Sequence, residues 1–302
     1  MPARRYVVAD VFTEHPYGGN QLAVVLDSEG LTTAQMLAIT REFNFSESTF
    51  VLPPDDPTHT ARVRIFTTAC EVPFAGHPNV GTAYVLARMG EVFGRRIGDT
   101  VVFEEWAGIV PVSIQTEQGV AVGATLTAPE PLWLGETFDV AAIAPCLRLE
   151  SGDVLLDRHA PREASVGLPF VVVEVASVEA LARIRLDVEA SCALLEKHAG
   201  RGFLVYAREV SATSARLRAR VFCPQLGAAE DAATGSANAA LAGLLASLDP
   251  TTDGQFQYEV TQGVEMGRPS QLQLAAQKSA GVITAQVGGA CVTVMHGVLD
   301  ID

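Results

Sequence analysis

Residues 70–83 read CEVPFAGHPNVGTA, and a weaker copy of this stretch, EDAATGSA, returns at residues 230–237. Each copy follows a similar strand-like segment, which is VRIF at residues 63–66 and ARVF at residues 219–222. Each ends in Gly-Thr-Ala or Gly-Ser-Ala and opens a helix rich in alanine and leucine. A strand, a small-residue loop and a helix start that occur twice predict two related halves, which bring two helix N-termini to one cleft.

The rest of the chain alternates short strand patterns with helices, which predicts an α+β fold of two pseudo-symmetric halves, each a curved sheet around a central helix. The first central helix is expected to start at Pro78, run to Met89 and stop at Gly90. The second is expected from about Ser236 to Leu248. The halves are predicted to be residues 1–127 and 128–302, with separate strands at 282–287 and 291–295 and the last strand able to cross back.

Composition excludes several classes of protein. The 302 residues are 48% hydrophobic, which supports a sizeable core, and carry a net charge of -14, which argues against nucleic acid or an anionic membrane as a partner. No apolar run approaches the roughly 18 residues of a membrane span, and the N-terminus lacks the apolar core of a secretory signal. We therefore expect a cytoplasmic protein. Five cysteines without close pairing fit a reducing compartment, and the absence of metal-binding motifs predicts no metal site.

Several sequence blocks, taken together and in this order, resemble the phenazine-biosynthesis isomerase (PhzF-like) family. The blocks are DVFT at 10–13 with Gly19-Asn20, SESTF at 46–50, PFAGHP at 73–78, the stretch from Glu230 to Ser236, and QGVEMGRPS at 262–270. The resemblance implies two halves of the diaminopimelate-epimerase type, each a barrel around a central helix, and a homodimer. It also implies a cofactor-independent isomerase, similar to dihydro-hydroxyanthranilate isomerase. The chain departs from the family pattern at Ala232, where proline is common, and at Asn79-Val80, where Thr-Leu is common.

Glu47 and His77 are the first two catalytic candidates, because they match the family's proton-moving glutamate and its assisting histidine. The residue types alone favour a solvated turn glutamate for Glu47, and they leave His77 open between a functional residue and a capping or turn histidine. If Glu47 lies in a cleft, burial raises its pKa toward neutrality, where one carboxyl group both gives and takes a proton. The neighbouring Ser46 is expected to contact the substrate.

Asp231 is the third catalytic candidate by its match to the family, although an ordinary helix cap is the alternative. In the functional interpretation Asp231 faces Glu47 across the cleft, with the two carboxyl groups in opposite protonation states. Backbone N–H groups near Gly76, Gly235 and Ser236 are expected to bind the substrate's carboxylate, since the overall negative charge cannot attract it.

Two other functions are open. An amino-acid racemase or epimerase of this fold would use a thiol in each loop, but Ala75 and Ala232 stand at those positions, and only Cys70 and Cys223 lie nearby. The third possibility is a catalytically silent small-molecule-binding or scaffold protein. Glu104 and Glu105, beside Trp106, are expected to be the exposed end of a strand without a role.

Overall fold

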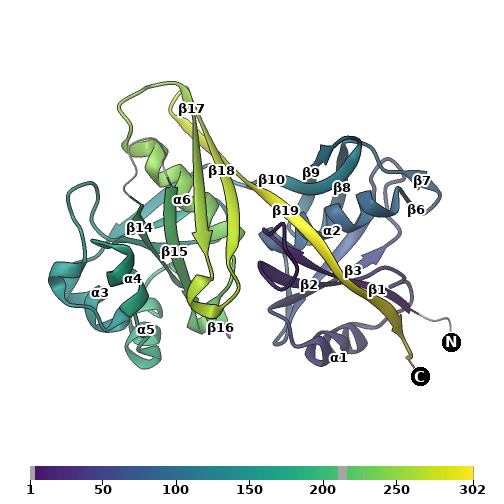
Figure 1. Cartoon of the computed structure of the whole chain (residues 1–302), viewed down its shortest axis with the longest axis horizontal. Coiled ribbons are helices and arrows are strands. Elements are labelled where there is room, and N and C mark those ends of the chain that lie inside the picture. The colour runs from purple at the N-terminus through teal and green to yellow at the C-terminus, as the bar shows by residue number, and fades with distance from the viewer. Residues whose placement is uncertain (1–3, 210–215, 227, 302) are drawn as a thin grey trace. The chain divides into compact units, whose positions relative to one another are not determined.

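The computed structural model describes residues 4–209, 216–226 and 228–301. The chain divides into two compact units (Figure 1). Unit 1 consists of residues 1–127 and 288–302, and unit 2 consists of residues 128–287. Each unit is described by itself below.

Eight strands of unit 1 close into a barrel. In the order of their pairing, they are β1 (Arg4–Val11), β2 (Asn20–Val25), β3 (Glu47–Leu52), β4 (Ala61–Thr67), β8 (Thr100–Glu105), β9 (Gly108–Glu117), β10 (Val120–Thr127) and β19 (Val282–Leu299), which pairs with β1 again. The pairs β2–β3 and β4–β8 are parallel. Because the ring is closed, the strands of the barrel leave no free edge.

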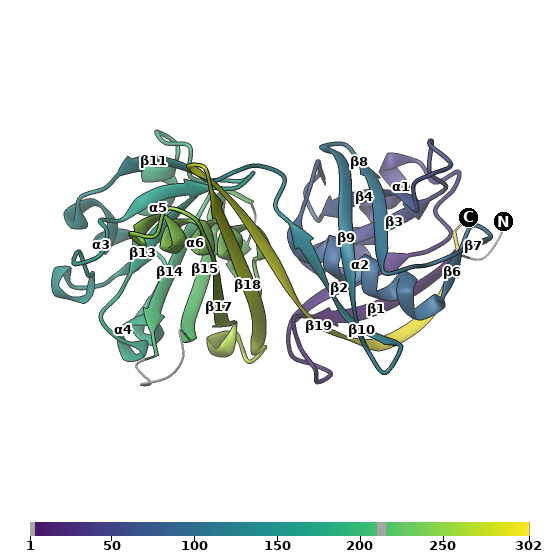
Figure 2. The same ribbon diagram turned by 90° about the horizontal axis from the view of Figure 1, so that it is seen from above.

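Helix α2 (Gly76–Met89) fills the barrel, as Figure 2 shows. Every residue from Gly76 to Leu86 is buried, so all sides of the helix face the inside of the barrel. Gly81 permits this close fit, because a Cβ atom there would lie 2.6 Å from Leu22 Cδ2 and 2.7 Å from Val11 Cγ2. The helix ends at Gly90, whose φ of 76° suits a residue without a side chain.

A second helix, α1 (Thr33–Phe43), covers the outside of unit 1 and starts with a capping box between Thr32 and Gln35. Its buried Met36 joins a small core with Phe50 and Phe66, whose rings meet edge to face. The remaining short strands of unit 1 are β5 (Glu71–Val72), β6 (Glu91–Val92) and β7 (Arg95–Arg96). Of these, β5 pairs with the end of β4.

Unit 2 is a curved sheet around helix α6 (Gly235–Leu248), which is buried from Ala237 to Ala246. Its strands are β11 (Trp133–Thr137), β12 (Arg162–Ser165), β13 (Phe170–Glu174), β14 (Phe203–Arg208), β15 (Arg216–Cys223), β16 (Ala228–Asp231), β17 (Gly254–Gln262), β18 (Ser270–Ser279) and the first part of β19. The turn between β18 and β19 is Ala280-Gly281, both with positive φ. The segment before β11 also bonds to β19, because the amide of Leu132 donates to the carbonyl of Ile283 at 2.7 Å.

Short helices cover the outer face of the unit 2 sheet. They are α3 (Val140–Leu147), α4 (Val178–Arg183) and α5 (Val188–Leu195), and the 3-10 turns are η1 (Ser151–Asp153), η2 (Pro224–Leu226) and η3 (Val264–Met266). Ile143, Leu181 and Leu195 from the three helices are fully buried against strand residues such as Val173 and Phe203. This second core stabilises unit 2 from the side opposite to α6.

One side-chain motif occurs in both units. In unit 1, Arg64 on β4 binds Glu71 through two hydrogen bonds of 2.7 and 2.6 Å, and its guanidinium lies 5.2 Å from the ring centre of Phe66. In unit 2, Arg220 on β15 binds Glu230 at 2.8 Å through both bonds and lies 5.0 Å from the ring centre of the aromatic residue two positions further on. The equivalence of Arg64 and Arg220 sets the register between the two units.

The starts of the two central helices correct the expected alignment of the two copies. Both central helices begin at the first glycine of their loop, so Gly235 corresponds to Gly76 and not to Gly81. Gly81 lies in the second turn of α2 for the packing reason given above. Pro78 is accordingly the third helical residue instead of the first, a position that also needs no N–H group.

The strands expected at 282–287 and 291–295 are one continuous strand, β19, of 18 residues. Gly288 and Gly289 between them do not break it. At Gly288 a Cβ atom would lie 2.8 Å from the carbonyl oxygen of Ala124, so the glycine lets β10 and β19 approach closely.

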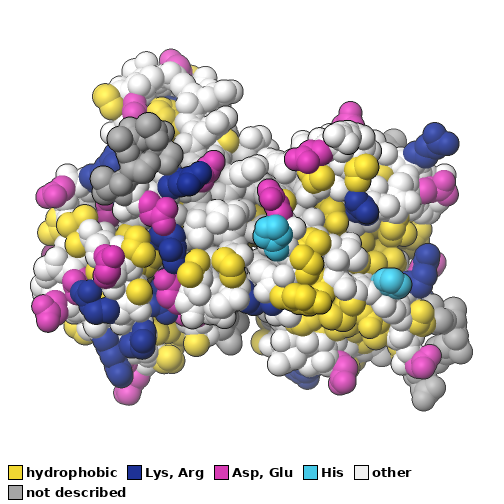
Figure 3. Space-filling view, viewed as in Figure 1, with side chains coloured by type: hydrophobic (Ala, Val, Ile, Leu, Met, Phe, Trp, Pro, Cys, Tyr) yellow, Lys and Arg dark blue, Asp and Glu magenta, His cyan; other side chains and the backbone are white. Residues whose placement is uncertain are grey.

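Charged side chains of both signs lie on the surface. Figure 3 shows one face, on which basic and acidic side chains are interspersed without a continuous basic patch among the described residues. Within the described ranges, no helix combines the length and apolar character that crossing a membrane requires.

Candidate active site

Unit 1 contains four of the predicted site residues, one of which, Gly76, is the first residue of α2. Glu47 is the first residue of β3, Ser46 precedes it, and His77 is the second residue of α2. The parallel pairing of β2 with β3 places the start of β3 beside Leu22 of β2, at the end of the barrel where α2 begins. As a result His77 Nδ1 lies 3.7 Å from Glu47 Oε2, although the two residues are 30 positions apart.

The carboxyl group of Glu47 is enclosed although part of its side chain reaches the surface. The side chain as a whole is 21% exposed, whereas its Oε2 atom is buried and makes no hydrogen bond within the described residues. Burial raises the pKa of Glu47 to about 7, and a hydrogen bond from Ser46 opposes this shift only in part. Near neutral pH the group is therefore present in both protonation states.

Asn20, at the start of β2, also belongs to this cluster. Its Nδ2 atom lies 3.5 Å from Nδ1 of His77, and its Oδ1 atom accepts a hydrogen bond of 3.2 Å from Ser46 Oγ. Asn20 was not among the predicted site residues, although the sequence contains a signal. The preceding Gly19 has a φ of 61° and a Cβ atom there would collide with Val11, so this turn needs glycine to present Asn20.

Unit 2 holds the remaining predicted residues around the start of α6. Asp231 ends β16 and is half-buried, and its Oδ2 atom accepts a hydrogen bond of 2.6 Å from Thr234 Oγ1. Gly235 and Ser236 are the first two residues of α6. Gln262, at the end of β17, donates to the carbonyl of Asp231 at 2.8 Å and accepts from Asn238 at 2.7 Å. This network holds the Asp231 loop against the helix.

The two central helices start in the same way. Neither Ala75 before α2 nor Thr234 before α6 makes a side-chain capping bond within the described residues. The fourth residue of each helix is an asparagine, and Asn79 and Asn238 donate back to the carbonyls of Ala75 and Thr234 at 3.1 and 2.9 Å. A helix N-terminus without a side-chain cap has N–H groups and a partial positive charge that favour an anion. The Gly-x-x-Asn pattern that both copies share was visible in the sequence but not used.

The expectation for Glu105 is wrong. Along β8, Val101 and Phe103 are fully buried, and Glu105 follows in the same alternation, so it points into the barrel. Both of its carboxyl oxygens are buried. Glu104 faces the other way and accepts hydrogen bonds of 2.7 Å from the amides of Asp55 and Asp56. Alternation along a strand puts Glu104 and Glu105 on opposite faces of the sheet. It does not show which face lies inside the barrel, so the sequence alone did not identify Glu105 as the inward-pointing residue.

No group of three or more His, Cys, Asp or Glu side chains suited to a metal ion occurs in the described part of the chain. Ala75 and Ala232 occupy the loops in which a thiol racemase would carry cysteine. Cys70 is exposed in the turn before β5, and Cys223 is buried at the end of β15. What the site offers is a carboxyl group that titrates near neutrality beside an imidazole.

Comparison with known proteins identifies the family of the chain. The family model of the phenazine biosynthesis-like proteins (PhzC-PhzF) matches residues 9–297. An uncharacterized isomerase of Mesorhizobium japonicum is 42% identical over 307 aligned positions that cover both chains completely. The trans-2,3-dihydro-3-hydroxyanthranilate isomerase of Pseudomonas aeruginosa is 37% identical over 285 positions, which is 93% of each chain.

The fold is also found in solved structures. A phenazine biosynthesis protein of the PhzF family from Bacillus anthracis matches with a TM-score of 0.89 over the full length of both chains, at 23% identity. At that identity the likeness concerns the fold alone. The expected α+β class, with a barrel around a central helix, is thereby confirmed.

Proposed function

Since the chain belongs to the phenazine biosynthesis-like protein family, we propose that this isomerase moves a proton within a small carboxylate-bearing substrate and that Glu47 carries the proton. The observation that carries the proposal is the enclosed carboxyl group of Glu47, whose pKa of about 7 lets it accept and release a proton at neutral pH. The transfer needs no cofactor in this proposal.

The proposed reaction keeps the composition of the substrate unchanged. The Glu47 carboxylate takes a proton from one carbon, and the electron pair left behind shifts through the adjoining double bond. The protonated Glu47 then returns a proton to another carbon of the same molecule. His77, 3.7 Å from Glu47 Oε2, is placed to orient the carboxyl group or polarise the substrate.

The helix starts supply the proposed recognition of the substrate. The first turn of α2, with Gly76, and that of α6, with Gly235 and Ser236, each lack a side-chain cap, so either turn by itself would donate hydrogen bonds from its N–H groups to a substrate carboxylate. Asp231, held by Thr234, is the proposed second carboxyl group of the reaction. The substrate of the P. aeruginosa relative, trans-2,3-dihydro-3-hydroxyanthranilate, carries such a carboxylate and is the first compound to test.

The test is an isomerisation assay in D2O with this compound and a panel of other small unsaturated carboxylic acids. We expect an isomer of unchanged mass apart from deuterium at the newly protonated carbon. Glu47→Gln should lower kcat/KM by about 10²–10⁴-fold, the usual contribution of a general acid–base group. Glu42→Gln, which changes an exposed carboxylate on α1, is the matched control.

Two outcomes would contradict the proposal. Full activity of Glu47→Gln would exclude Glu47 as the proton carrier. Tight binding of a carboxylic acid without turnover, for every compound of the panel, would instead favour a silent binding protein. We also propose a homodimer, which analytical ultracentrifugation tests.

A further inference from the structure

Glu105 and Asn79 form a buried polar pair inside the barrel of unit 1 that the proposed reaction does not use. Asn79 is fully buried, and its Oδ1 atom has no hydrogen-bond partner in the described residues. The same holds for both carboxyl oxygens of Glu105, for which Asn79 is the interacting side chain. Buried polar groups without partners are costly, so two of them side by side indicate a specific arrangement.

Strand register identifies the counterpart of Glu105 in unit 2. Ala61 of β4 pairs with Phe103 of the parallel strand β8, two positions before Glu105. Leu217 of β15, which corresponds to Ala61 in the register set by the two arginines, pairs with Val260 of the parallel strand β17. Two positions after Val260 is Gln262. Glu105 and Gln262 therefore occupy the same place in the two units, at the end of a strand beside the start of the central helix.

Gln262 shows what this place does. Its side-chain amide donates to the carbonyl of Asp231 and to Thr234 Oγ1, at 2.8 and 3.2 Å. Its Oε1 atom accepts from Asn238 Nδ2 at 2.7 Å and from the Thr234 amide at 3.3 Å. An uncharged group that both donates and accepts thus ties the helix start to the loop before it. Asn79, the counterpart of Asn238, brings the same amide to Glu105 in unit 1.

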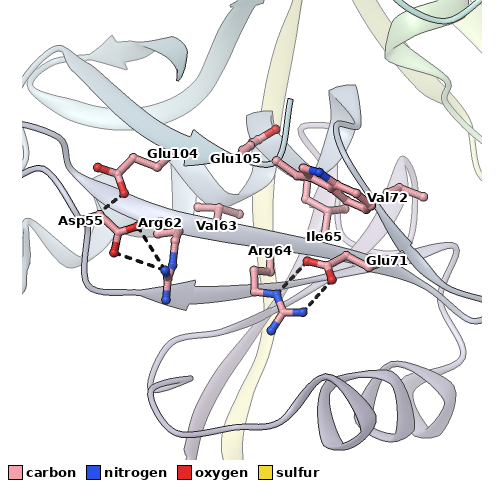
Figure 4. Close-up of a pocket in the computed structure, with 10 residues that line it drawn as sticks. Asp55, Arg62, Val63, Arg64, Ile65, Glu71, Val72, Glu104 and Glu105 are labelled. Atoms are coloured by element: carbon pink, nitrogen blue, oxygen red, sulfur yellow. Dashed lines mark hydrogen bonds and ion pairs between the residues drawn. The ribbon is translucent and has the colours of Figure 1, made fainter. Parts of the chain in front are cut away.

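The charged groups around Glu105 leave its carboxyl group without a cation. They line a pocket of about 370 Å3 next to β4 and β5 (Figure 4). Each has a partner of its own. Asp55 pairs with Arg62 and Glu71 with Arg64, and Glu104 pairs with His59 and two backbone amides. From α2 the nearest titratable group along the chain is His77, and β9 presents Gly108 opposite Glu105.

We propose that Glu105 is a positioning residue whose carboxyl group is uncharged in the folded protein, and that it holds Asn79 and the first turn of α2, including His77, as Gln262 holds the first turn of α6. A protonated carboxyl group has one donor and an acceptor oxygen, the same pair of functions as the glutamine amide. The raised pKa of Glu105, about 8 because of burial, agrees with this state at neutral pH.

The first experiment needs no substrate. We compare the midpoint of thermal unfolding of the whole protein and of Glu105→Gln between pH 5 and pH 9. The folded protein holds a proton on Glu105 that the unfolded chain releases above its ordinary pKa, so the wild type should lose stability relative to Glu105→Gln as pH rises toward 8. Glu117→Gln is the matched control, because it changes an exposed carboxylate at the end of the neighbouring strand β9. A difference between wild type and Glu105→Gln that stays constant from pH 5 to 9 would overturn the uncharged state.

The second experiment tests positioning, by hydrogen–deuterium exchange of the peptide that contains residues 76–83. Glu105→Leu should raise exchange in this peptide at least severalfold, and Glu105→Gln should restore the wild-type level. A kinetic measurement then rests on the proposed isomerase function. Glu105→Leu should lower kcat at least tenfold with little change in KM, whereas Glu105→Gln stays within a few fold. Unchanged exchange in Glu105→Leu would refute the positioning role, whether or not an isomerase substrate is found, and an unfolded Glu105→Leu would leave the pH comparison as the deciding measurement.

Discussion

The two units share an arginine–glutamate pair and a central helix, but they differ in the titratable side chains near the start of that helix. In both units an arginine binds a glutamate and lies over the ring of a phenylalanine. In both units the central helix has an asparagine in its first turn. At equivalent positions, unit 1 has His77 where unit 2 has Ser236, and Glu105 where unit 2 has Gln262. The repeated parts are those that form the sheet and place the helix, whereas the differing parts lie at the helix start, where a ligand would bind.

The proposed catalytic carboxyl groups do not occupy equivalent positions. Phe66 pairs with Ser48 in unit 1, and Phe222 pairs with Phe203 in unit 2, so Glu47, one residue before Ser48, corresponds to Gly202. Likewise Val72 pairs with Ile65 and Asp231 pairs with Val221, so Asp231 corresponds to Val72. The two proposed catalytic carboxyl groups therefore have different surroundings within their units.

The largest expected effect is on activity, at the non-equivalent carboxyl group of unit 2. Asp231→Asn removes the charge while Thr234 can still donate to the amide oxygen, and we expect kcat/KM to fall about 10²–10⁴-fold. Val72→Thr changes the equivalent position of unit 1 and should leave kcat/KM within about threefold of the wild type. If Val72→Thr lowered kcat/KM as much as Asp231→Asn, the difference between the two equivalent positions would have no functional meaning.

The two arginine–glutamate pairs should differ in their contribution to stability. The Arg220 side chain is 6% exposed and also donates to the carbonyls of Leu181 and Ile184, whereas the Arg64 side chain is 24% exposed. We expect Arg220→Met to lower the free energy of unfolding by about 3–5 kcal/mol, since it removes a buried cation from Glu230 and also leaves the carbonyls of Leu181 and Ile184 without their donor. Arg64→Met should cost only about 1–2 kcal/mol. Urea denaturation of both variants measures the difference, and an Arg64→Met cost as large as that of Arg220→Met would contradict it.

The stability of unit 1 should depend on pH through Glu47. Its folded pKa of about 7 lies above its ordinary value of 4.5, so its stabilising contribution is complete below pH 4.5 and is lost as pH rises to about 7. Over this range the loss amounts to about 3 kcal/mol at most. Glu47→Gln should remove this part of the pH dependence in chemical denaturation between pH 4.5 and 7. A Glu47→Gln profile parallel to that of the wild type would show that the carboxyl group is ionised in the folded protein.

The smallest effect concerns a buried hydroxyl pair. Thr49 Oγ1 and Thr82 Oγ1 lie 2.8 Å apart inside unit 1, and the equivalent positions of unit 2 are the fully buried Leu204 and Leu241. Either single change, Thr49→Val or Thr82→Val, leaves one hydroxyl without its partner and should cost about 1–3 kcal/mol. The double variant should come within about 1 kcal/mol of the wild type, as replacing both partners by apolar groups is nearly neutral. A double variant as unstable as the sum of the single variants would show that the two hydroxyls are not coupled.

Local patterns predicted much of this protein, and long-range pairing explains where they failed. The repeat of loop and helix and the stop at Gly90 follow from short stretches, whereas the candidates Glu47 and Asp231 follow from the family resemblance. The expected alignment of the two central helices differs by five residues from the one in the structure, because the choice between Gly76 and Gly81 depends on packing against β1 and β2. Asn20 was missed for the same reason, since it meets His77 only after β2 and β3 pair.

The sequence by itself determined that two similar halves exist, that each has a helix preceded by a loop of small residues, and which family the chain resembles. Local propensities and turn residues are written along the chain, and they suffice for these conclusions. Only the tertiary structure decided which carboxyl groups are buried, because burial depends on which face of a strand meets the central helix. Glu104 and Glu105 are neighbours of one type, yet the closure of the barrel leaves one on the outside and encloses the other.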